Sequence, residues 1–270
     1  DGADELFGGY NRYISSKAIW KKVSWIPRFV RVGIGWCILH IPTTFIDRIG
    51  NFFIKLIYGK PIPLLGNKAH KLGSGILHAK NLFEFCKSFT FTWEKPSILI
   101  KGEVGIASSE NKLSDTADPI SNIMFIDSEG YLPDDILCKV DRASMSCSLE
   151  TRAPYLDIDV IEVATRIPLD FKIYSGRGKQ TLRRILDKYV PNELIDRPKA
   201  GFAVPIGEWL RGPLKLWAEK LLAKELITNQ GYLNYETINQ TWTKHQSGKY
   251  DFTEKLWSIL IFQLWLEEHN

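Results

Sequence analysis

The first ten residues, DGADELFGGY, combine acids and glycines at a density that is typical of a loop handling a cation or a phosphate. Asp1 and Asp4 offer carboxylate oxygens, which are the ligands that Mg²⁺ prefers. A helix that starts in this stretch would also present free backbone N–H groups to an anion. On residue types alone, a helix-capping loop in which Asp4 satisfies those N–H groups is the better explanation.

Two lysines stand in loops that glycine or proline shapes. In SGRGKQTLRR, two glycines precede Lys179 at the start of a helical pattern, which resembles a phosphate cradle with free N–H groups and a cation. The Walker A pattern G-x-x-x-x-G-K-[ST] is absent, and a lone G-x-G-K is a weak signal. In DRPKAGFAVPIGEWL, Lys199 lies between Pro198 and Gly201, which hold a backbone in place. A solvated surface lysine is the alternative at position 199.

The segment VDRASMSCSLETRAPYLD carries alternating charges and then a proline. Arg152 within reach of a carboxylate predicts a buried bidentate pair that orients a loop, and Asp157 predicts a helix cap. A structural role is the better default for this segment. Signatures of hydrolases, G-x-S-x-G and H-E-x-x-H, are absent from the sequence, and its five histidines stand apart.

The elements that must position these residues are mostly helical. Apolar residues recur at three- and four-residue spacings, and prolines separate the segments. The pattern predicts helices over Asn11–Lys22, Arg28–Leu39, Thr43–Tyr58, Lys68–Lys80, Ile120–Tyr131, Asp134–Ser146, Asp157–Arg166, Gly178–Tyr189 and Thr253–His269. Strand signals are few, and the polar segment 101–119 predicts a mobile surface loop.

Three helical segments predict how the chain packs. Val32–Ile46 is fifteen residues long without a charge, whereas a membrane span needs about 20 residues. It predicts a buried helix, a break at Pro42 and a new helix capped by Thr43 or Thr44. The next segment has the clearest apolar stripe, formed by Phe45, Ile49, Phe52, Phe53 and Leu56. Thr253–His269 is apolar nearly all round at its centre, which predicts deep packing.

Composition is that of a globular protein, and the charge is unevenly distributed. The 270 residues are 44% hydrophobic with a net charge of +4. Between Arg12 and Lys60 there are nine Lys/Arg and one acid, and between Lys172 and Lys215 ten against four. The first run includes Trp20, Trp25 and Trp36, so a basic helix lying on a membrane is a lesser alternative. The four cysteines (Cys37, Cys86, Cys138, Cys147) form no C-x-x-C pair and predict buried free thiols in a reducing compartment.

Taken together and in order, these stretches resemble the synthetase domain of glutamine-dependent asparagine synthetases. The resemblance rests on DGADELFGGY, LPDDILCKVDRASMSCSLETRAPYLD, GRGKQTLRR, RPKAGFAVPIGEWLRG and LWSILIFQLW. It implies a mainly α chain: the helical C-terminal portion of an adenine-nucleotide α-hydrolase-like α/β domain, with most of the parallel sheet missing. We expect residues 1–270 to form a single helical unit of such a domain.

The resemblance also implies a two-step reaction. Aspartate attacks the α-phosphorus of ATP to give β-aspartyl-AMP and pyrophosphate, and ammonia from a glutaminase domain then displaces AMP. By this likeness Asp4 would bind Mg²⁺, and Asp1 would face the acyl-adenylate and the ammonia. Lys179 and Lys199 would neutralise phosphate charge, with Lys199 also catalytic. Glu150, Arg152 and Asp157 would support the pocket.

The family's pyrophosphate loop, S-G-G-x-D-S, and its N-terminal glutaminase cysteine are absent from residues 1–270. We therefore expect the C-terminal part of a synthetase domain that is inactive alone. ATP and Mg²⁺ would serve the parent enzyme and neither would bind the fragment. A homodimer through a face exposed by truncation, a cytoplasmic location and no nucleic-acid partner complete the expectation, and a membrane partner is disfavoured.

Two other functions remain open at this point. A relative of the same enzyme class would adenylate a different carboxylate and form a lactam, a peptide bond or an amidated sugar. A protein of another class would be a catalytically dead helical module, whose basic stretches contact a polyanion or a membrane surface. Nucleic-acid binding of that kind would weaken steeply with salt.

Overall fold

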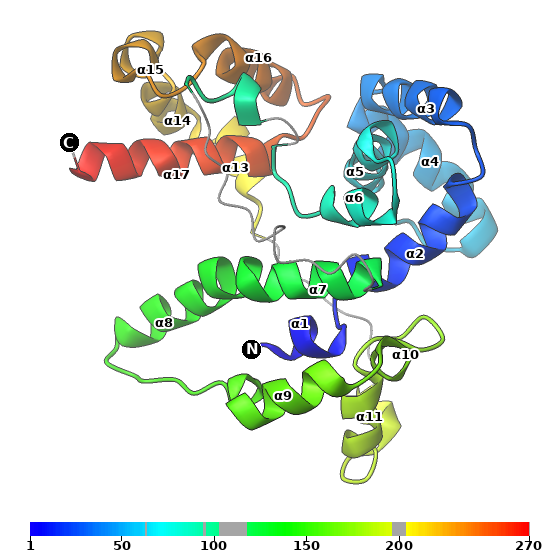
Figure 1. Cartoon of the computed structure of the whole chain (residues 1–270). Helices are drawn as coiled ribbons and strands as arrows, with labels where there is room; N and C mark the ends of the chain where they lie inside the picture. Colours follow the sequence, from blue (N-terminus) through cyan, green and yellow to red (C-terminus); the bar gives the residue numbers. More distant parts are fainter. Residues whose placement is uncertain (63, 94–95, 103–117, 196–203, 270) are drawn as a thin grey trace. The chain divides into compact units, whose positions relative to one another are not determined.

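The computed structural model of the protein describes residues 1–62, 64–93, 96–102, 118–195 and 204–269. Regular structure in these residues is helical, and β-type pairing there is limited to isolated bridges between Ile100 and Leu233 and between Tyr174 and Arg177. The predicted mainly α class is therefore confirmed (Figure 1).

The chain divides into two compact units, each assembled from three separate segments. Unit 1 comprises Asp1–Arg28, Ala79–Phe89 and Ala107–Ala200, and unit 2 comprises Phe29–His78, Thr90–Ile106 and Gly201–Asn270. The single helical unit expected over residues 1–270 stays a prediction. Of the predicted loop 101–119, residues 103–117 lie outside the described residues.

Unit 1 surrounds the short N-terminal helix α1 (Ala3–Phe7). This helix lies between α7 (Pro119–Glu129) and α9 (Ile158–Arg166), and it contacts both of them (Figure 1). Tyr13 and Ile123 belong to the hydrophobic core of unit 1. The remaining helical elements are α2 (Asn11–Val23), α6 (Leu82–Lys87), the π-helical turn η3 (Leu132–Leu137), α8 (Cys138–Met145), η4 (Pro154–Leu156), α10 (Leu169–Lys172), α11 (Gln180–Leu186) and α12 (Asn192–Ile195).

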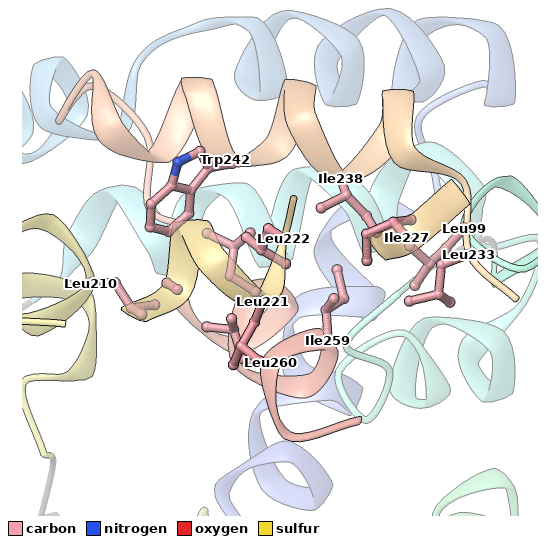
Figure 2. Packing of buried hydrophobic residues seen from close by; sticks show 12 residues of the cluster. Leu99, Leu210, Leu221, Leu222, Ile227, Leu233, Ile238, Trp242, Ile259 and Leu260 are labelled. Carbon is pink, nitrogen blue, oxygen red and sulfur yellow. The ribbon is translucent and has the colours of Figure 1, made fainter. Parts of the chain in front are cut away.

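Unit 2 has a larger core, in which the C-terminal helix α17 (Thr253–His269) is central. Ile259 and Leu260 of α17 pack among side chains from the preceding helices (Figure 2). Leu256 of the same helix belongs to this cluster. The other helical elements are α3 (Arg28–His40), α4 (Thr43–Tyr58), α5 (Leu65–His78), η1 (Pro96–Ile98), α13 (Ile206–Arg211), α14 (Lys215–Leu221), α15 (Lys224–Gln230) and α16 (Tyr235–Gln246).

The predicted cap of α4 is wrong. The residue that precedes the helix is Pro42, and no side chain caps its first turn. The hydroxyl of Thr43 instead donates a hydrogen bond to the carbonyl of Lys249, at 3.0 Å. Proline fixes the extended backbone before the helix, so a hydroxyl cap is not needed to begin it.

Burial of the apolar helices also differs from prediction. The stripe from Phe45 to Leu56 on α4 is exposed, as are Phe29 and Trp36 of α3. Helix α17 buries one side only, because Ile261 and Trp265 are exposed. Periodicity states which residues share a helix face, and it does not state what covers that face.

The four cysteines are free thiols, as predicted, but they are not all buried. Cys86 is buried, Cys138 is half-buried, and Cys37 and Cys147 are exposed. Burial raises the pKa of the Cys86 thiol to about 11, so this thiol stays protonated at neutral pH.

In the described part of the chain no single helix is long and apolar enough to cross a membrane. The pair of helices Arg28–His40 and Thr43–Ile57 passes that test of length and composition only when the two are taken together, with a bend of 102° between them.

Candidate functional site

Asp4 and Lys179 form the site within unit 1. The Lys179 ammonium donates to the Asp4 carboxylate, with Nζ 2.8 Å from Oδ2, although the residues are 175 positions apart in sequence. The Asp4 side chain is 31% exposed and that of Lys179 is 30% exposed, so both charges remain accessible from solvent. The two candidates of the N-terminal loop and the G-x-G-K segment therefore belong to one place on the surface.

Two glycines allow these loops to meet. A Cβ at Gly9 would lie 2.1 Å from the Asp4 carboxylate and 2.2 Å from Cε of Lys179. A Cβ at Gly178 would lie 2.0 Å from the carbonyl oxygen of Gly8. A side chain at Gly178 would meet backbone that cannot move aside, and one at Gly9 would push the Asp4 and Lys179 side chains out of their present contact, so the ion pair depends on glycine at both positions.

The backbone of Lys179 is also held in place. Its N–H donates to the carbonyl of Phe7 at 3.0 Å, which ties the end of α1 to the start of α11. Lys179 has φ of 56°, in the left-handed region that non-glycine residues rarely occupy. Such a backbone costs on the order of 1 kcal/mol and persists only where its surroundings hold it.

A buried polar network lies behind this ion pair. Glu5, on the turn that carries Asp4, is buried and accepts a hydrogen bond from the Tyr10 hydroxyl at 2.5 Å. Burial, and then this bond, raise the pKa of the Tyr10 phenol, so Tyr10 remains a neutral donor.

The network continues from α2 to α7. The Arg12 guanidinium lies 2.7 Å from the buried carboxylate of Asp127, which also accepts a hydrogen bond from Tyr13. Burial and then the Asp127 charge raise the pKa of the Tyr13 phenol. Arg12 also lies over the ring of Tyr10, 4.3 Å from its centre. These contacts fix the helices on which the Asp4 loop rests.

Sequence reasoning missed this supporting network. Arg12 and Asp127 are 115 residues apart, and neither stands in a motif. One local signal is present in the sequence. Tyr10, Arg12 and Tyr13, whose side chains all end in polar groups, follow Gly8 and Gly9 directly, at the start of the next helix.

The other predicted site residues have different positions. Asp1 is exposed, one residue before the turn that starts α1, and Lys199 lies outside the described residues. Glu150 and Arg152 do form an ion pair, at 2.7 Å. The prediction that Arg152 enters a buried pair is wrong, because both side chains of the observed pair are largely exposed and solvent screens their attraction.

Asp157 caps helix α9 as the sequence predicts. Its carboxylate accepts a hydrogen bond from the N–H of Asp159 at 3.0 Å. The preceding Tyr155 and Leu156 lie against the Asp1–Gly2 end of the chain, since a Cβ at Gly2 would contact both side chains. The cap therefore fixes a segment that lies against the start of α1.

The donor set fits a magnesium ion that is shared with a phosphate. Described residues contain no cluster of three or more His, Cys, Asp or Glu side chains that could hold a metal by themselves. Mg²⁺ is commonly bound through one or two carboxylates together with substrate phosphates and water. One carboxylate (Asp4) beside one ammonium (Lys179) is compatible with that mode and would not hold a dehydrated metal alone.

Comparison with known proteins gives one family for the chain. The family model described as asparagine synthase matches residues 1–267. Asparagine synthetase [glutamine-hydrolyzing] 1 of Bacillus subtilis is 28% identical over 98% of this chain and 39% of its own length. A putative asparagine synthetase [glutamine-hydrolyzing] of Mycobacterium bovis is 31% identical over 98% of this chain and 38% of its own length.

A more distant similarity covers part of the chain. Amidase chyE of Penicillium rubens is 26% identical over 47% of this chain and 20% of its own length. No solved structure gives a significant match. The chain thus spans about two fifths of the length of the synthetases above, and the match with the family model runs through both the Asp4 loop and the Lys179 loop. On these grounds the chain belongs to the asparagine synthase family.

Proposed function

We propose that residues 1–270 form part of an ATP-dependent amide synthetase that makes asparagine from aspartate and ammonia. The aspartate side-chain carboxylate attacks the α-phosphorus of ATP and displaces pyrophosphate, which leaves β-aspartyl-AMP. Ammonia from a glutaminase domain then attacks the activated carbonyl and AMP leaves. The observation that carries the proposal is the accessible Asp4–Lys179 pair, held at 2.8 Å by two glycine-dependent loops.

In this proposal Lys179 acts on the leaving group. Attack on phosphorus places negative charge on the departing pyrophosphate, and a cation fixed beside it lowers the barrier. The left-handed backbone at Lys179 and its bond to Phe7 fix the start of this side chain, and the bond from Nζ to Asp4 positions the ammonium before substrate enters. In the complex with ATP, a pyrophosphate oxygen would accept the hydrogen bond from Lys179 Nζ in place of Asp4 Oδ2. That oxygen of Asp4 would then be available to Mg²⁺.

Asp4 would hold the magnesium ion that accompanies ATP. That ion supplies charge neutralisation to the phosphates when it is bound. Lys199 would add a second ammonium, and Asp1 would accept a proton from the incoming ammonia. Glu150, Arg152 and Asp157 would keep the neighbouring segment in place.

Exchange of labelled pyrophosphate into ATP tests the adenylation half-reaction directly. The full-length protein that contains this chain should catalyse exchange that requires aspartate and Mg²⁺. We expect Lys179→Met and Asp4→Asn to lower its kcat/KM by about 10²–10³-fold, the effect of removing one charge-stabilising contact from a transition state.

Lys17→Met is the matched control, because Lys17 also pairs with an aspartate, Asp118, in unit 1 but at 3.5 Å and with 61% exposure. It should retain exchange activity. Equal loss in all three variants would show a general folding effect, and full activity of Lys179→Met would contradict the proposal. Residues 1–270 in isolation should give no exchange, because they contain no S-G-G-x-D-S loop.

The acceptor is decided by product analysis with ATP, glutamine and aspartate. One similar protein is named an amidase, so an enzyme that activates the carboxylate of a different substrate is the second candidate. In that case ATP would be consumed with another acid and no asparagine would form. A dead binding module would show neither exchange nor ATP consumption. For the synthetase we propose the cytoplasm as its compartment and no nucleic acid among its partners.

A further inference from the structure

Helix α4 has its apolar face on the outside. Phe52 is 66% exposed and Leu56 is 76% exposed. The exposed apolar side chains of this helix are Phe45, Ile49, Phe52, Phe53, Leu56 and Ile57, which we call the α4 face. At 100° per residue the first five lie within about a third of the helix circumference, so they form one continuous stripe.

Polar side chains of α4 hold it to the rest of unit 2. The Asp47 carboxylate accepts a hydrogen bond from the N–H of Gly66, at 2.9 Å, where α5 begins. Asn51 makes two bonds with the backbone of Ile62, one as donor to the carbonyl and one as acceptor from the N–H. Polar side chains thus take part in attaching α4, while its largest apolar side chains face outward, which is unusual for a surface helix.

Helix α3 also exposes large apolar side chains. Its Arg31 is buried, whereas Phe29 and Trp36 are exposed on another side of the helix. The two helices follow one another with a two-residue break, so exposed apolar residues continue over some 30 residues of chain. Soluble monomers rarely expose contiguous apolar patches of this kind unless a partner covers them.

Positive charge borders the α4 face. Arg48 and Lys55 follow Phe45 and Phe52 by three residues, which places both cations along one edge of the stripe, and both are exposed. The one acid of α4, Asp47, accepts a hydrogen bond from the N–H of Gly66 and lies away from the stripe. The surroundings of the apolar stripe therefore favour a negatively charged partner.

We propose that the α4 face docks on the surface of a membrane that contains anionic phospholipid. Large apolar and aromatic side chains bordered by Lys and Arg are the pattern of helices that lie in the headgroup region. A helix of 16 residues is about 24 Å long, shorter than a hydrocarbon core of about 30 Å. The 102° bend before it also favours helices that lie along the surface over a straight span.

Vesicle flotation tests this docking. The full-length protein that contains the chain is mixed with vesicles of phosphatidylcholine alone or of phosphatidylcholine with 30% phosphatidylglycerol. We expect it to float with the anionic vesicles and to bind them at least tenfold more weakly in 0.5 M NaCl than in 0.05 M NaCl, since salt screens the headgroup attraction.

Two pairs of substitutions separate the apolar and the charged contributions. Phe52→Ser with Leu56→Ser should weaken partitioning by about tenfold or more, because both side chains would leave the bilayer interface. Arg48→Gln with Lys55→Gln should abolish the preference for anionic vesicles and leave the residual binding to neutral ones unchanged. All four residues are exposed, so the melting temperature should not fall.

Matched controls lie on helix α14 and helix α16. Leu216→Ser removes an equally exposed leucine (81%), and Lys220→Gln with Lys244→Gln removes two exposed charges. Both should float as the unmodified protein does. The proposal is overturned if the protein does not float at all, or if Phe52→Ser with Leu56→Ser floats unchanged. It is equally overturned if the apolar variant instead converts a dimer to a monomer without any vesicle binding, since the face would then join two copies.

Discussion

His245, fully buried in unit 2, is a neutral hydrogen-bonding centre. Its Nδ1 accepts from the N–H of Phe252 at 3.2 Å and lies 3.3 Å from the Arg211 guanidinium, while Nε2 donates to the carbonyl of Gly207. Burial, and then the Arg211 charge, lower the pKa of His245 below its ordinary value of 6.5, despite the nearby Asp251 carboxylate. A protonated ring would place a second cation beside Arg211.

The stability of the protein should therefore fall as pH decreases from 7 to 5. The unfolded chain takes up a proton at His245 near pH 6.5, whereas the folded protein takes it up only at lower pH. A proton that only the unfolded chain binds lowers the free energy of unfolding by up to about 1.4 kcal/mol for each pH unit of acidification. The pKa of Asp251 is lowered from 3.8, so its contribution is lost only below this window.

His245→Asn should flatten this slope, as measured by urea unfolding at pH 7, 6 and 5. The variant will be less stable at every pH because it loses packing, so the slope is the diagnostic quantity. His269→Asn, at an exposed histidine, is the control and should keep the slope. An unchanged slope in His245→Asn would contradict the assignment. His70, whose pKa burial also lowers, should supply part of the slope that remains.

At the scale of residues, the sequence allowed Asp4 and Lys179 to be chosen but not to be paired. The neighbours of each residue give only a weak signal, a carboxylate in a glycine loop and a lysine after G-x-G, and the family resemblance is what selects both. Their contact depends on close approach of backbone at Gly9 and Gly178, which only three-dimensional structure reveals. Arg12 and Asp127 were not predicted either, because two residues that pair from distant parts of the chain produce no recognisable motif.

Among the elements, the crossing of α3 and α5 rests on a glycine. A Cβ at Gly35 would lie 2.7 Å from the carbonyl oxygen of Gly73 and 3.0 Å from the N–H nitrogen of Leu77. Both are backbone atoms, which cannot rotate away from a clash as the end of a side chain can. A Cβ at Gly33, in the same helix, would meet nothing within 4 Å.

Gly35→Ala should destabilise unit 2 by about 1–3 kcal/mol, because the two helices must separate. Gly33→Ala should instead stabilise it by about 0.5–1 kcal/mol through helix propensity. Chemical denaturation of the two variants side by side measures both effects. A loss of stability in both, or in neither, would contradict the close helix crossing.

Helices with strong stripes were predicted well, and their environment was not. The segments Asn11–Lys22, Arg28–Leu39 and Thr43–Tyr58 each agree with a helix to within one residue at either end. The stripe on Thr43–Tyr58 is real but faces outward, because Asp47 and Asn51 provide the inward attachment. Helices α13, α14 and α15 were missed, since six or seven residues are too few to show a period.

For the whole molecule, the two hydrophobic cores raise the question of how many units unfold independently. The core of unit 1 includes the buried Ile123, and that of unit 2 includes the buried Leu260. The two clusters share no buried residue. If each core stabilises its own unit, damage to one should leave the other folded, contrary to the single helical unit that the sequence predicts.

Leu260→Ala and Ile123→Ala test this separation. Each removes a fully buried side chain and should cost about 2–5 kcal/mol. Hydrogen exchange followed by mass spectrometry should show faster exchange in peptides of unit 2 for Leu260→Ala and in peptides of unit 1 for Ile123→Ala. Leu216→Ala, at an exposed leucine, should leave both patterns unchanged. Faster exchange throughout the chain in both core variants would mean that residues 1–270 unfold as one cooperative unit, because loss of either core would then release every helix.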